Sequence, residues 1–171
     1  MRRAFLLIGV VVLACSFALA QKQTRKPSSN PAQPDLKLVY QRWVNEDVAY
    51  IITPEEKRAF ESLTSDAQRE SFIEQFWQAR NSKGVGNENA YRTEHYRRFA
   101  HANQTFGIGN LPGWKTARGR IYITLGQPDE IRNTSAREVW FYRQAPGFGT
   151  NVEIEFTNDS DPNGFRIVKN P

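Results

Sequence analysis

The chain has 171 residues, of which 39% are hydrophobic and 24% are charged, and its formal net charge is +5. This length suffices for one domain with a substantial hydrophobic core. Two of the 23 basic residues lie within residues 1–20, which leaves 21 basic against 18 acidic residues in the rest of the chain. So small an excess excludes the dense basic surface of nucleic-acid-binding domains, and we expect no nucleic-acid partner.

The first twenty residues have the three parts of a secretory signal. Two arginines are followed by an apolar run over residues 4–17 and by small residues up to Ala20. This order is typical of a cleaved signal peptide. The apolar run is shorter than the roughly 20 residues that a membrane-spanning helix needs. We predict cleavage after Ala20 and a secreted or periplasmic protein.

Two alternatives to this cleavage remain open. The sequence VLAC at residues 12–15 is similar to the lipid-attachment motif of lipoproteins, so the chain could be anchored at Cys15. An uncleaved anchor is the other alternative. Because Cys15 is the only cysteine, cleavage after Ala20 leaves a mature chain without disulfides or thiolate ligands. Contact with a membrane is expected only if Cys15 carries a lipid.

Residues 21–35, QKQTRKPSSNPAQPD, contain no large apolar side chain and four prolines or serines in their second half alone. Such a segment cannot bury enough surface to offset the entropy of ordering. We predict a disordered linker over residues 21–35 and a single folded domain over residues 36–171.

Helical patterns follow the linker. Apolar residues recur at three- to five-residue spacing from Leu36 to Val48, and the short apolar run 48–52 has the composition of an extended segment. The sequence TPEE at residues 53–56 predicts a helix that begins with a capping box, because Thr and Glu stand three positions apart with Pro between them.

Two longer helices are expected next. The sequence SDAQ at residues 65–68 has the form of a second capping box. The helix that it begins is expected to end near Arg80, before a glycine-bearing break. A third helix is expected over residues 89–106, since Gly107 follows it directly. Both helices carry an aromatic stripe, which needs an apolar surface to cover it.

The apolar period falls to two in the second half of the chain. Alternating or continuous apolar runs predict four strands, over residues 121–125, 138–143, 152–156 and 165–168. Gly, Pro, Asn or Asp residues separate them as turns. Helices first and strands afterwards predict an α+β fold, in which the N-terminal helices pack on one face of a C-terminal four-stranded antiparallel meander.

The stretch GWKTARGRIYITLGQPDEI at residues 113–131 resembles the signature of the GWxTD domain, an extracytoplasmic bacterial family of undefined activity. The sequences YIITPEEKRAF, FIEQFWQAR and HYRRFAHANQTF before it, and EVWFYR and NVEIEF after it, agree with the family in their order. The resemblance covers residues 36–168. Ala117 stands where the signature has Asp, so a carboxylate at this position is not required for the function of this chain.

A structural interpretation explains most residue types in this stretch. Gly126, Pro128 and Asp129 would end a strand in a turn, because Gly tolerates positive φ, Pro fixes its own φ and Asp bonds nearby amides. Trp114 would fill the helix-to-sheet junction, where burial of an indole contributes on the order of 2–3 kcal/mol.

A chemical interpretation of the same stretch stays open. Asp129 and Glu130 could form an acid and base pair, while Arg118 and Arg120 hold an anionic substrate. The two arginines are two positions apart, which places them on the same face of an extended strand, beside Tyr122.

The chain offers few metal ligands. His95 and His101 are six positions apart on one predicted helix, about 120° apart around its axis, so they cannot share a metal ion as an i, i+4 pair does. We expect His95, on the apolar stripe, to be a core-edge residue with its hydrogen bonds satisfied.

Residues 159–164, DSDPNG, fit the first half of an EF-hand loop. The second half fails, because position twelve is Asn170 instead of Glu. A turn between strands is the favoured interpretation. Weak calcium binding by Asp159, Asp161 and Asn163 is the alternative, and we expect no other metal and no cofactor.

Two functions are compatible with these patterns. The first is a non-catalytic, extracytoplasmic interaction module that presents an aromatic and arginine-bearing sheet face or edge to an envelope or secreted protein. The run 138–143 is apolar on both faces, so a sheet covered on one side would expose Trp140 with Tyr142. The alternative is a hydrolase or transferase. The candidate site residues for both are Arg118, Arg120, Tyr122, Asp129, Glu130, Trp140 and Tyr142.

Overall fold

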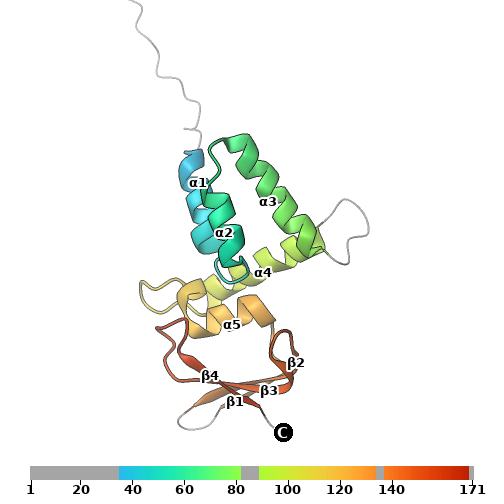
Figure 1. The fold of residues 1–171 in the computed structure, drawn as a ribbon. Helices are drawn as coiled ribbons and strands as arrows, with labels where there is room; N and C mark the ends of the chain where they lie inside the picture. Colours follow the sequence, from blue (N-terminus) through green and yellow to red (C-terminus); the bar gives the residue numbers. More distant parts are fainter. Residues whose placement is uncertain (1–34, 82–88, 134–136, 170–171) are drawn as a thin grey trace, which may run out of the picture. The chain divides into compact units, whose positions relative to one another are not determined.

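The computed structural model describes residues 35–81, 89–133 and 137–169. Within these ranges, five α-helices precede a four-stranded antiparallel sheet in the chain (Figure 1). The predicted α+β class is therefore confirmed. The predicted signal peptide over residues 1–20, and all of the predicted linker except Asp35, lie outside the described residues.

The first helical segment begins at a side-chain cap. α1 (Leu36–Arg42) follows Asp35, whose carboxylate accepts a hydrogen bond from the backbone N–H of Lys37 at 3.0 Å. A π-helical turn continues the helix over Trp43–Asp47. The expectation of an extended segment over residues 48–52 is wrong. These residues form turns, because the amides of Ile51 and Ile52 both donate to the carbonyl of Val48 at 2.9 Å.

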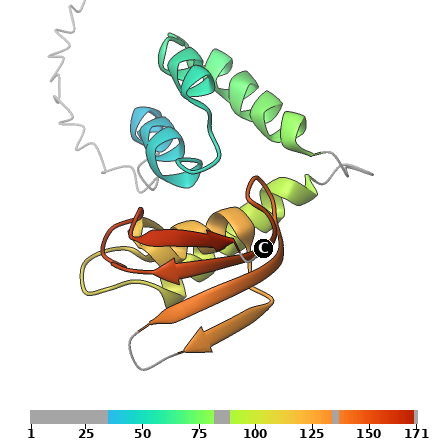
Figure 2. The ribbon, with the colours of Figure 1, turned by 60° about the horizontal axis from the view of Figure 1, so that its bottom comes forward.

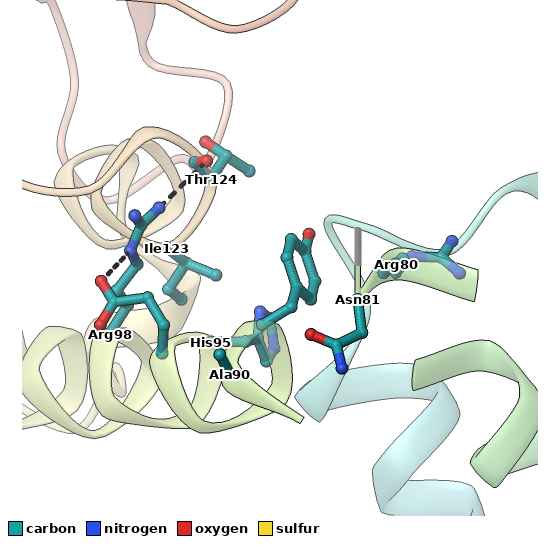
Figure 3. A pocket seen from close by; sticks show the side chains of 9 residues that line it. Arg80, Asn81, Ala90, His95, Arg98, Ile123 and Thr124 are labelled. Carbon is teal, nitrogen blue, oxygen red and sulfur yellow. Dashed lines mark hydrogen bonds and ion pairs between the residues drawn. The ribbon is translucent and has the colours of Figure 1, made fainter. Parts of the chain in front are cut away.

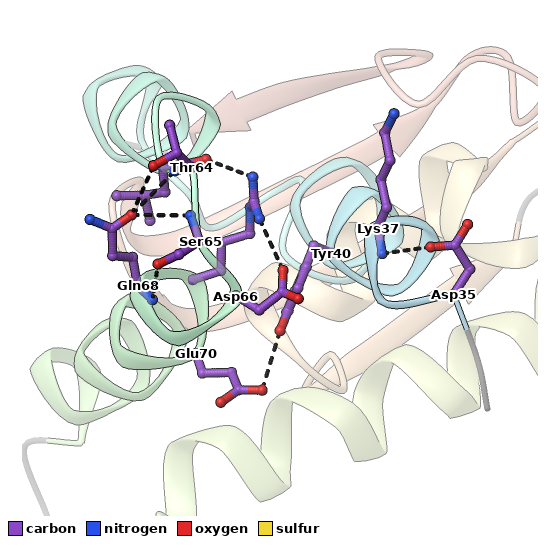
Figure 4. A network of polar contacts seen from close by, with 10 residues as sticks. Asp35, Lys37, Tyr40, Thr64, Ser65, Asp66, Gln68 and Glu70 are labelled. Atoms are coloured by element: carbon purple, nitrogen blue, oxygen red, sulfur yellow. Dashed lines mark hydrogen bonds and ion pairs between the residues drawn. The ribbon is translucent and has the colours of Figure 1, made fainter.

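Both predicted capping boxes are present, and Figure 4 shows the one at Ser65 and Gln68. α2 (Pro54–Glu61) begins at Thr53. α3 (Asp66–Arg80) begins at Ser65, whose hydroxyl accepts from the amide of Gln68 while the Gln68 side chain accepts from the amide of Ser65. α3 ends at the predicted residue. The hydroxyl of Tyr40 donates to Glu70 at 3.2 Å, which links α1 to α3.

The N-terminal helices enclose an aromatic core of their own. The ring of Trp43 lies 4.9 Å from that of Phe60 and 5.2 Å from that of Phe76. Tyr40, Val44, Val48 and Trp77 complete the buried cluster. The expectation that these helices cover the sheet is therefore wrong for α1, α2 and α3, whose buried residues pack on one another. α4 (Ala90–Thr105) occupies the range predicted for the third helix and buries His95, Phe99 and Ala102.

The predicted strand over residues 121–125 is a helix. α5 (Ala117–Leu125) follows the short 3₁₀ turn Gly113–Lys115, and its N-cap is Thr116. Ile121, Tyr122 and Ile123 are all buried, because α5 lies between α4 and the sheet and has apolar neighbours on several sides. A helix buried in this way has no polar face and therefore no helical period in its sequence. The apolar alternation over residues 121–125 consequently resembles that of a strand.

The sheet is the predicted meander, with a different first strand. β1 (Glu130–Asn133), β2 (Glu138–Ala145), β3 (Gly149–Phe156) and β4 (Phe165–Lys169) pair in chain order, and every pair is antiparallel. β2, β3 and β4 contain the other three predicted strands. β1 and β4 are the edges of the sheet (Figure 2).

One face of the sheet forms the second core. The register places Ile131, Trp140, Ile154 and Ile167 in one row across the four strands. Trp140 and Ile154 are buried against α5, and Ile167 packs at the margin of the same cluster. Ile131, at the β1 end of the row, is 52% exposed. Among the helices that the structure describes, none is long and apolar enough to cross a membrane.

Candidate binding groove

The first part of the resembling stretch builds a tight backbone corner. A Cβ atom at Gly113 would lie 1.8 Å from the carbonyl oxygen of Ala102, and one at Gly119 would lie 1.8 Å from the carbonyl oxygen of Gly113. Real Cβ atoms are not found so close to backbone, so both positions require glycine. The corner presses α5 against α4 through backbone contacts.

Thr116 closes this corner and begins α5. Its hydroxyl donates to the carbonyl of Gly113 at 2.8 Å and accepts from the amide of Gly119 at 3.0 Å. The side chain is completely buried. A buried hydroxyl with both a donor and an acceptor partner is satisfied, and the second bond is an N-cap. The threonine therefore has a structural role.

Trp114 is buried, as predicted, but its neighbours are helices and turns instead of the sheet. Its ring stacks on Phe99 of α4 at 6.1 Å, and its backbone is held at both ends. The amide donates to Asn103 at 3.0 Å, and the carbonyl accepts from the hydroxyl of Tyr50 at 2.8 Å. The tryptophan thus joins α4 to the turn that follows α1 and the π-helical turn.

Arg118 lies at the N-terminus of α5 between two carboxylates. Its guanidinium pairs with Glu138 at 2.9 Å and with Asp159, and Asp159 also accepts from the Arg118 amide at 2.9 Å. Desolvation lowers the pKa of Arg118, but its hydrogen bonds and charge pairs with the two carboxylates outweigh that effect and raise it. Arg118 is a fixed structural cation.

Arg120 points elsewhere, so the predicted common face for the two arginines is wrong. Residues two positions apart on a helix are separated by about 200° around its axis. The guanidinium of Arg120 lies over the rings of Tyr50 at 5.3 Å and Phe165 at 5.6 Å, and it donates to Asn163. Tyr122, expected beside both arginines, is instead buried.

The two adjacent carboxylates have separate partners. Asp129 accepts from the amide of Arg143 at 2.8 Å and pairs with its guanidinium at 3.4 Å. Glu130 pairs with Arg132 through both oxygens at 2.9 Å, and this hydrogen bonding lowers the pKa of Glu130. Asp129 and Glu130 therefore pair with Arg143 and Arg132, and not with Arg118 or Arg120, the cations of the catalytic alternative.

Trp140 and Tyr142 are 1% and 2% exposed, so the prediction that they form a surface pair is wrong. Their polar atoms are satisfied internally: the indole N–H of Trp140 donates to Glu138 at 2.7 Å, and the hydroxyl of Tyr142 donates to the carbonyl of Gly126 at 3.0 Å. Burial raises the pKa of Tyr142. They are covered because α5, expected to be a strand, is a helix on their face.

The opposite face of the sheet is covered by ion pairs. Arg132 reaches across to Glu153 at 2.6 Å and lies over the ring of Phe141 at 5.3 Å. Further along, Glu155 is buried beneath Arg137 and Arg166. These pairs shield the half-buried aromatic ring and neutralise each other's charges.

The calcium candidates in the loop between β3 and β4 already have polar partners, two of them on α5. Asp159 pairs with Arg118, Asp161 accepts from the amide of Asn163 at 2.8 Å, and Asn163 accepts from Arg120. In the part of the chain that the structure describes, no group of three His, Cys, Asp or Glu residues could hold a metal ion. A calcium ion at this loop would have to displace guanidinium groups.

The two histidines contact different neighbours. Nε2 of His95 lies 2.7 Å from the carbonyl oxygen of Asp47. A carbonyl can only accept, so Nε2 carries the proton, and burial lowers the pKa of the ring. His95 is 4% exposed, which confirms its predicted core position. The ring of His101 stacks on Tyr122 with the centroids 4.4 Å apart.

A groove of about 560 Å³ brings together three of the predicted site residues, Arg118, Tyr122 and Trp140. It lies between the end of α4, the loop that follows it, α5 and the first two strands. The other lining residues are His101, Thr105, Phe106, Gly107, Ile108, Gln127, Pro128, Ile131, Glu138 and Asp159. Arg120, Asp129, Glu130 and Tyr142 do not line it.

The groove has a buried aromatic interior and an apolar rim. Tyr122 and Trp140 are almost fully buried, whereas Ile108 is 43% exposed and Ile131 is 52% exposed. Neither isoleucine was among the site residues predicted from the sequence. Ile108 stands in a short loop without periodicity, and Ile131 lies between two charged residues, so neither carries a local signal of a binding surface.

A second cavity of about 320 Å³ lies beside α4 and α5 (Figure 3). Each of its charged side chains, Arg80, Glu94 and Arg98, already has a partner. Arg98 donates to Glu94 at 2.7 Å and to the carbonyl of Thr124 at 3.4 Å. Hydrogen bonds from Arg97 and Arg98 lower the pKa of Glu94 to about 2. Arg80 bonds Glu56 at 2.7 Å. The groove, with its exposed apolar rim, is therefore the stronger candidate.

Comparisons with known proteins agree with the resemblance seen in the sequence. The family model of the GWxTD domain matches residues 27–170. No curated protein and no solved structure matches the chain. Because the family model covers nearly the whole chain, including the corner at residues 113–119, the groove and the sheet, the protein belongs to the GWxTD domain family.

Proposed function

We propose that this chain is a non-catalytic interaction module that works outside the cytoplasm and binds an apolar segment of an envelope or secreted protein in its groove. The sequence led us to expect an exposed aromatic sheet face as the binding surface. Because Trp140 and Tyr142 are buried, we now propose the groove instead. The observation that carries the proposal is the pairing of two exposed isoleucines, Ile108 and Ile131, on the rim of one cavity. Large exposed apolar side chains that gather at a concave site are typical of binding surfaces.

The composition of the groove favours a polypeptide ligand. The nearly buried rings of Tyr122 and Trp140 form its floor, and the half-buried Phe106 is the ring that an apolar side chain can contact. Its polar lining includes Glu138 and Asp159, both of which pair with Arg118. An apolar anchor in an aromatic pocket with a polar rim is the usual arrangement of an interaction hot spot.

The groove supports catalysis less well than binding. The acid, base and anion-binding groups of the hydrolase or transferase alternative are Asp129, Glu130, Arg118 and Arg120, and only Arg118 lines the groove. Each carboxylate holds its own arginine, Arg143 or Arg132. A general base needs to reach a substrate proton, and a carboxylate held by an arginine is a poor base.

Location outside the cytoplasm rests on the signal pattern of residues 1–20. Intact-mass measurement of the protein from its native host tests it. A mass equal to that of a chain starting at Gln21 supports export with cleavage. A mass that includes a lipid on Cys15 places the domain on a membrane surface. A mass that includes residues 1–20 contradicts cleavage.

Site-specific crosslinking tests the groove. A photoreactive amino acid at Ile108 is expected to crosslink one partner in intact cells, whereas the same group at Leu38, which is 62% exposed on α1, is expected to give no such product. The Phe106→Ala variant, in which the interior is emptied, should lose the crosslink from position 108. Equal crosslinking from both positions, or a product unaffected by Phe106→Ala, would contradict the proposal.

A further inference from the structure

The free edge of β1 carries a self-complementary sequence. β1 pairs with β2 on one side, and no strand within the described residues pairs with its other side. Three consecutive residues, Glu130, Ile131 and Arg132, are exposed along this edge. When a second copy of this strand runs antiparallel to the first, the acid of each copy lies opposite the base of the other. An edge strand of this kind can accept another strand.

We propose that two copies of the chain associate by antiparallel pairing of their β1 strands, which joins two four-stranded sheets into one of eight strands. A two-fold axis perpendicular to the sheet relates the copies, so both apolar faces lie on the same side. Such an interface is isologous, since one patch meets its own copy.

Side-chain parity restricts the register of this pairing. Ile131 shares the inner face with Trp140, its partner in β2, whereas Arg132 lies over Phe141 and pairs with Glu153 on the outer face. Residues that lie opposite each other in an antiparallel pair are on the same face. Ile131 must therefore face an inner-face residue of the second copy, and registers shifted by one residue are excluded.

Charge selects one of the remaining registers. A shift by two residues sets Arg132 against Arg132 in one direction and Glu130 against Glu130 in the other, and like charges directly opposite are destabilising. The register centred on Ile131 sets each Glu130 against an Arg132 and the two Ile131 side chains against each other. Pro128, which has no N–H, limits the ladder just before β1.

This register also completes the apolar row of the inner face. The row of Ile167, Ile154, Trp140 and Ile131 is buried in the middle and ends at the half-exposed Ile131. In the pair, Ile131 of the second copy continues the row and covers that end. Ile131 also stands on the rim of the groove, so the dimer would bring the Ile131 of the second copy to that rim. The strand pairing itself runs along the β1 edge and needs no ligand in the groove.

Charge reversal with mixing tests the register. Sedimentation equilibrium of the purified protein should show a reversible dimer. Glu130→Arg alone and Arg132→Glu alone should each raise the dimer dissociation constant by about tenfold or more, because each places two like-charged pairs face to face. An equimolar mixture of the two variants should form a mixed dimer, in which every pair is again of opposite charge.

The mixture separates the proposal from a simpler explanation. Each variant also loses the ion pair between Glu130 and Arg132 within its own strand, and mixing cannot restore that pair. Val168→Lys, at an exposed apolar residue on the other edge strand, should leave the dimer unchanged, whereas Ile131→Lys should dissociate it. A wild-type protein that stays monomeric at its highest soluble concentration, or a mixture that stays monomeric, would overturn the proposal. Circular dichroism verifies that each variant is folded.

Discussion

Asp159 caps a helix that begins 42 residues earlier in the chain: its carboxylate accepts from the backbone N–H of Arg118 at 2.9 Å and also pairs with the Arg118 guanidinium. An anion at this position satisfies a free amide in the first turn of α5 and interacts favourably with the helix dipole. The loop between β3 and β4 is thereby fixed to the helix that covers the sheet.

Asp159→Ala is therefore expected to lower the free energy of unfolding by about 1–2 kcal/mol, since both the cap and the ion pair are lost. Asp159→Asn should cost less, because its amide oxygen can still accept from the Arg118 amide. Urea denaturation measures both. Equal and negligible effects of the two substitutions would show that the cap does not contribute to stability.

The glycines of the corner give a steric prediction. Gly113→Ala should destabilise the domain by about 2 kcal/mol or more, because its Cβ would lie 1.8 Å from the backbone of Ala102 and α4 would have to shift. Gly107→Ala is the matched control: its Cβ would meet no atom closer than 3.5 Å. Thermal unfolding should separate the two variants clearly, and similar melting temperatures would contradict the proposed close approach.

Trp114→Ala should lower the free energy of unfolding by about 3–5 kcal/mol, as expected for a large ring removed from a well-packed site. The ring is 9% exposed and contacts Phe99 and Tyr50. Trp114→Phe retains part of this packing and should cost less. Chemical denaturation followed by circular dichroism measures the difference, and a loss below about 1 kcal/mol for Trp114→Ala would show that the site can collapse around the gap.

The buried His95 is expected to lower the free energy of unfolding of the domain in mild acid. Burial lowers its pKa in the folded protein below the ordinary 6.5. The unfolded chain therefore binds a proton at a pH where the folded one does not. The stabilising contribution of neutral His95 is complete above pH 6.5 and is lost as the pH falls from there toward the folded pKa, with a slope of up to about 1.4 kcal/mol per pH unit.

His95→Gln provides the comparison, since its side-chain amide can still donate to the carbonyl of Asp47 but does not titrate. The difference in unfolding free energy between wild type and variant should change below pH 6.5 and be constant above it. A difference that is independent of pH would contradict the assignment of a neutral, proton-donating His95.

Features that depend on neighbouring residues could be predicted from the sequence. The caps at Thr53 and Ser65 were predicted correctly because in each a side chain bonds a backbone amide only three positions away. β2, β3 and β4 were predicted because each contains an apolar run, continuous in β2 and alternating in β3, that is bounded by turn residues. The fold class followed from the order of these elements.

The errors arose where tertiary contacts decide the structure. α5 was mistaken for a strand because it is buried between α4 and the sheet, and the exposed aromatic pair was wrong for the same reason. β1 was missed because four residues, two of them charged, carry too little pattern. The lining of the groove comes from α4 and the loop after it, from α5 and the first two strands, and from Asp159. No local signal in the sequence connects segments so far apart.

The backbone contact at Gly113 and Gly119 also limits how this chain can change during evolution. A side chain at Gly113 would push the corner away from α4, and one at Gly119 would push α5 away from the corner, whereas Lys115 between them is exposed. A sequence signature centred on these glycines is therefore a steric fingerprint. The signature identifies chains whose backbone makes the same bend. Residues at the rim of the groove lie outside these glycines, so ligand specificity can change while the signature stays the same.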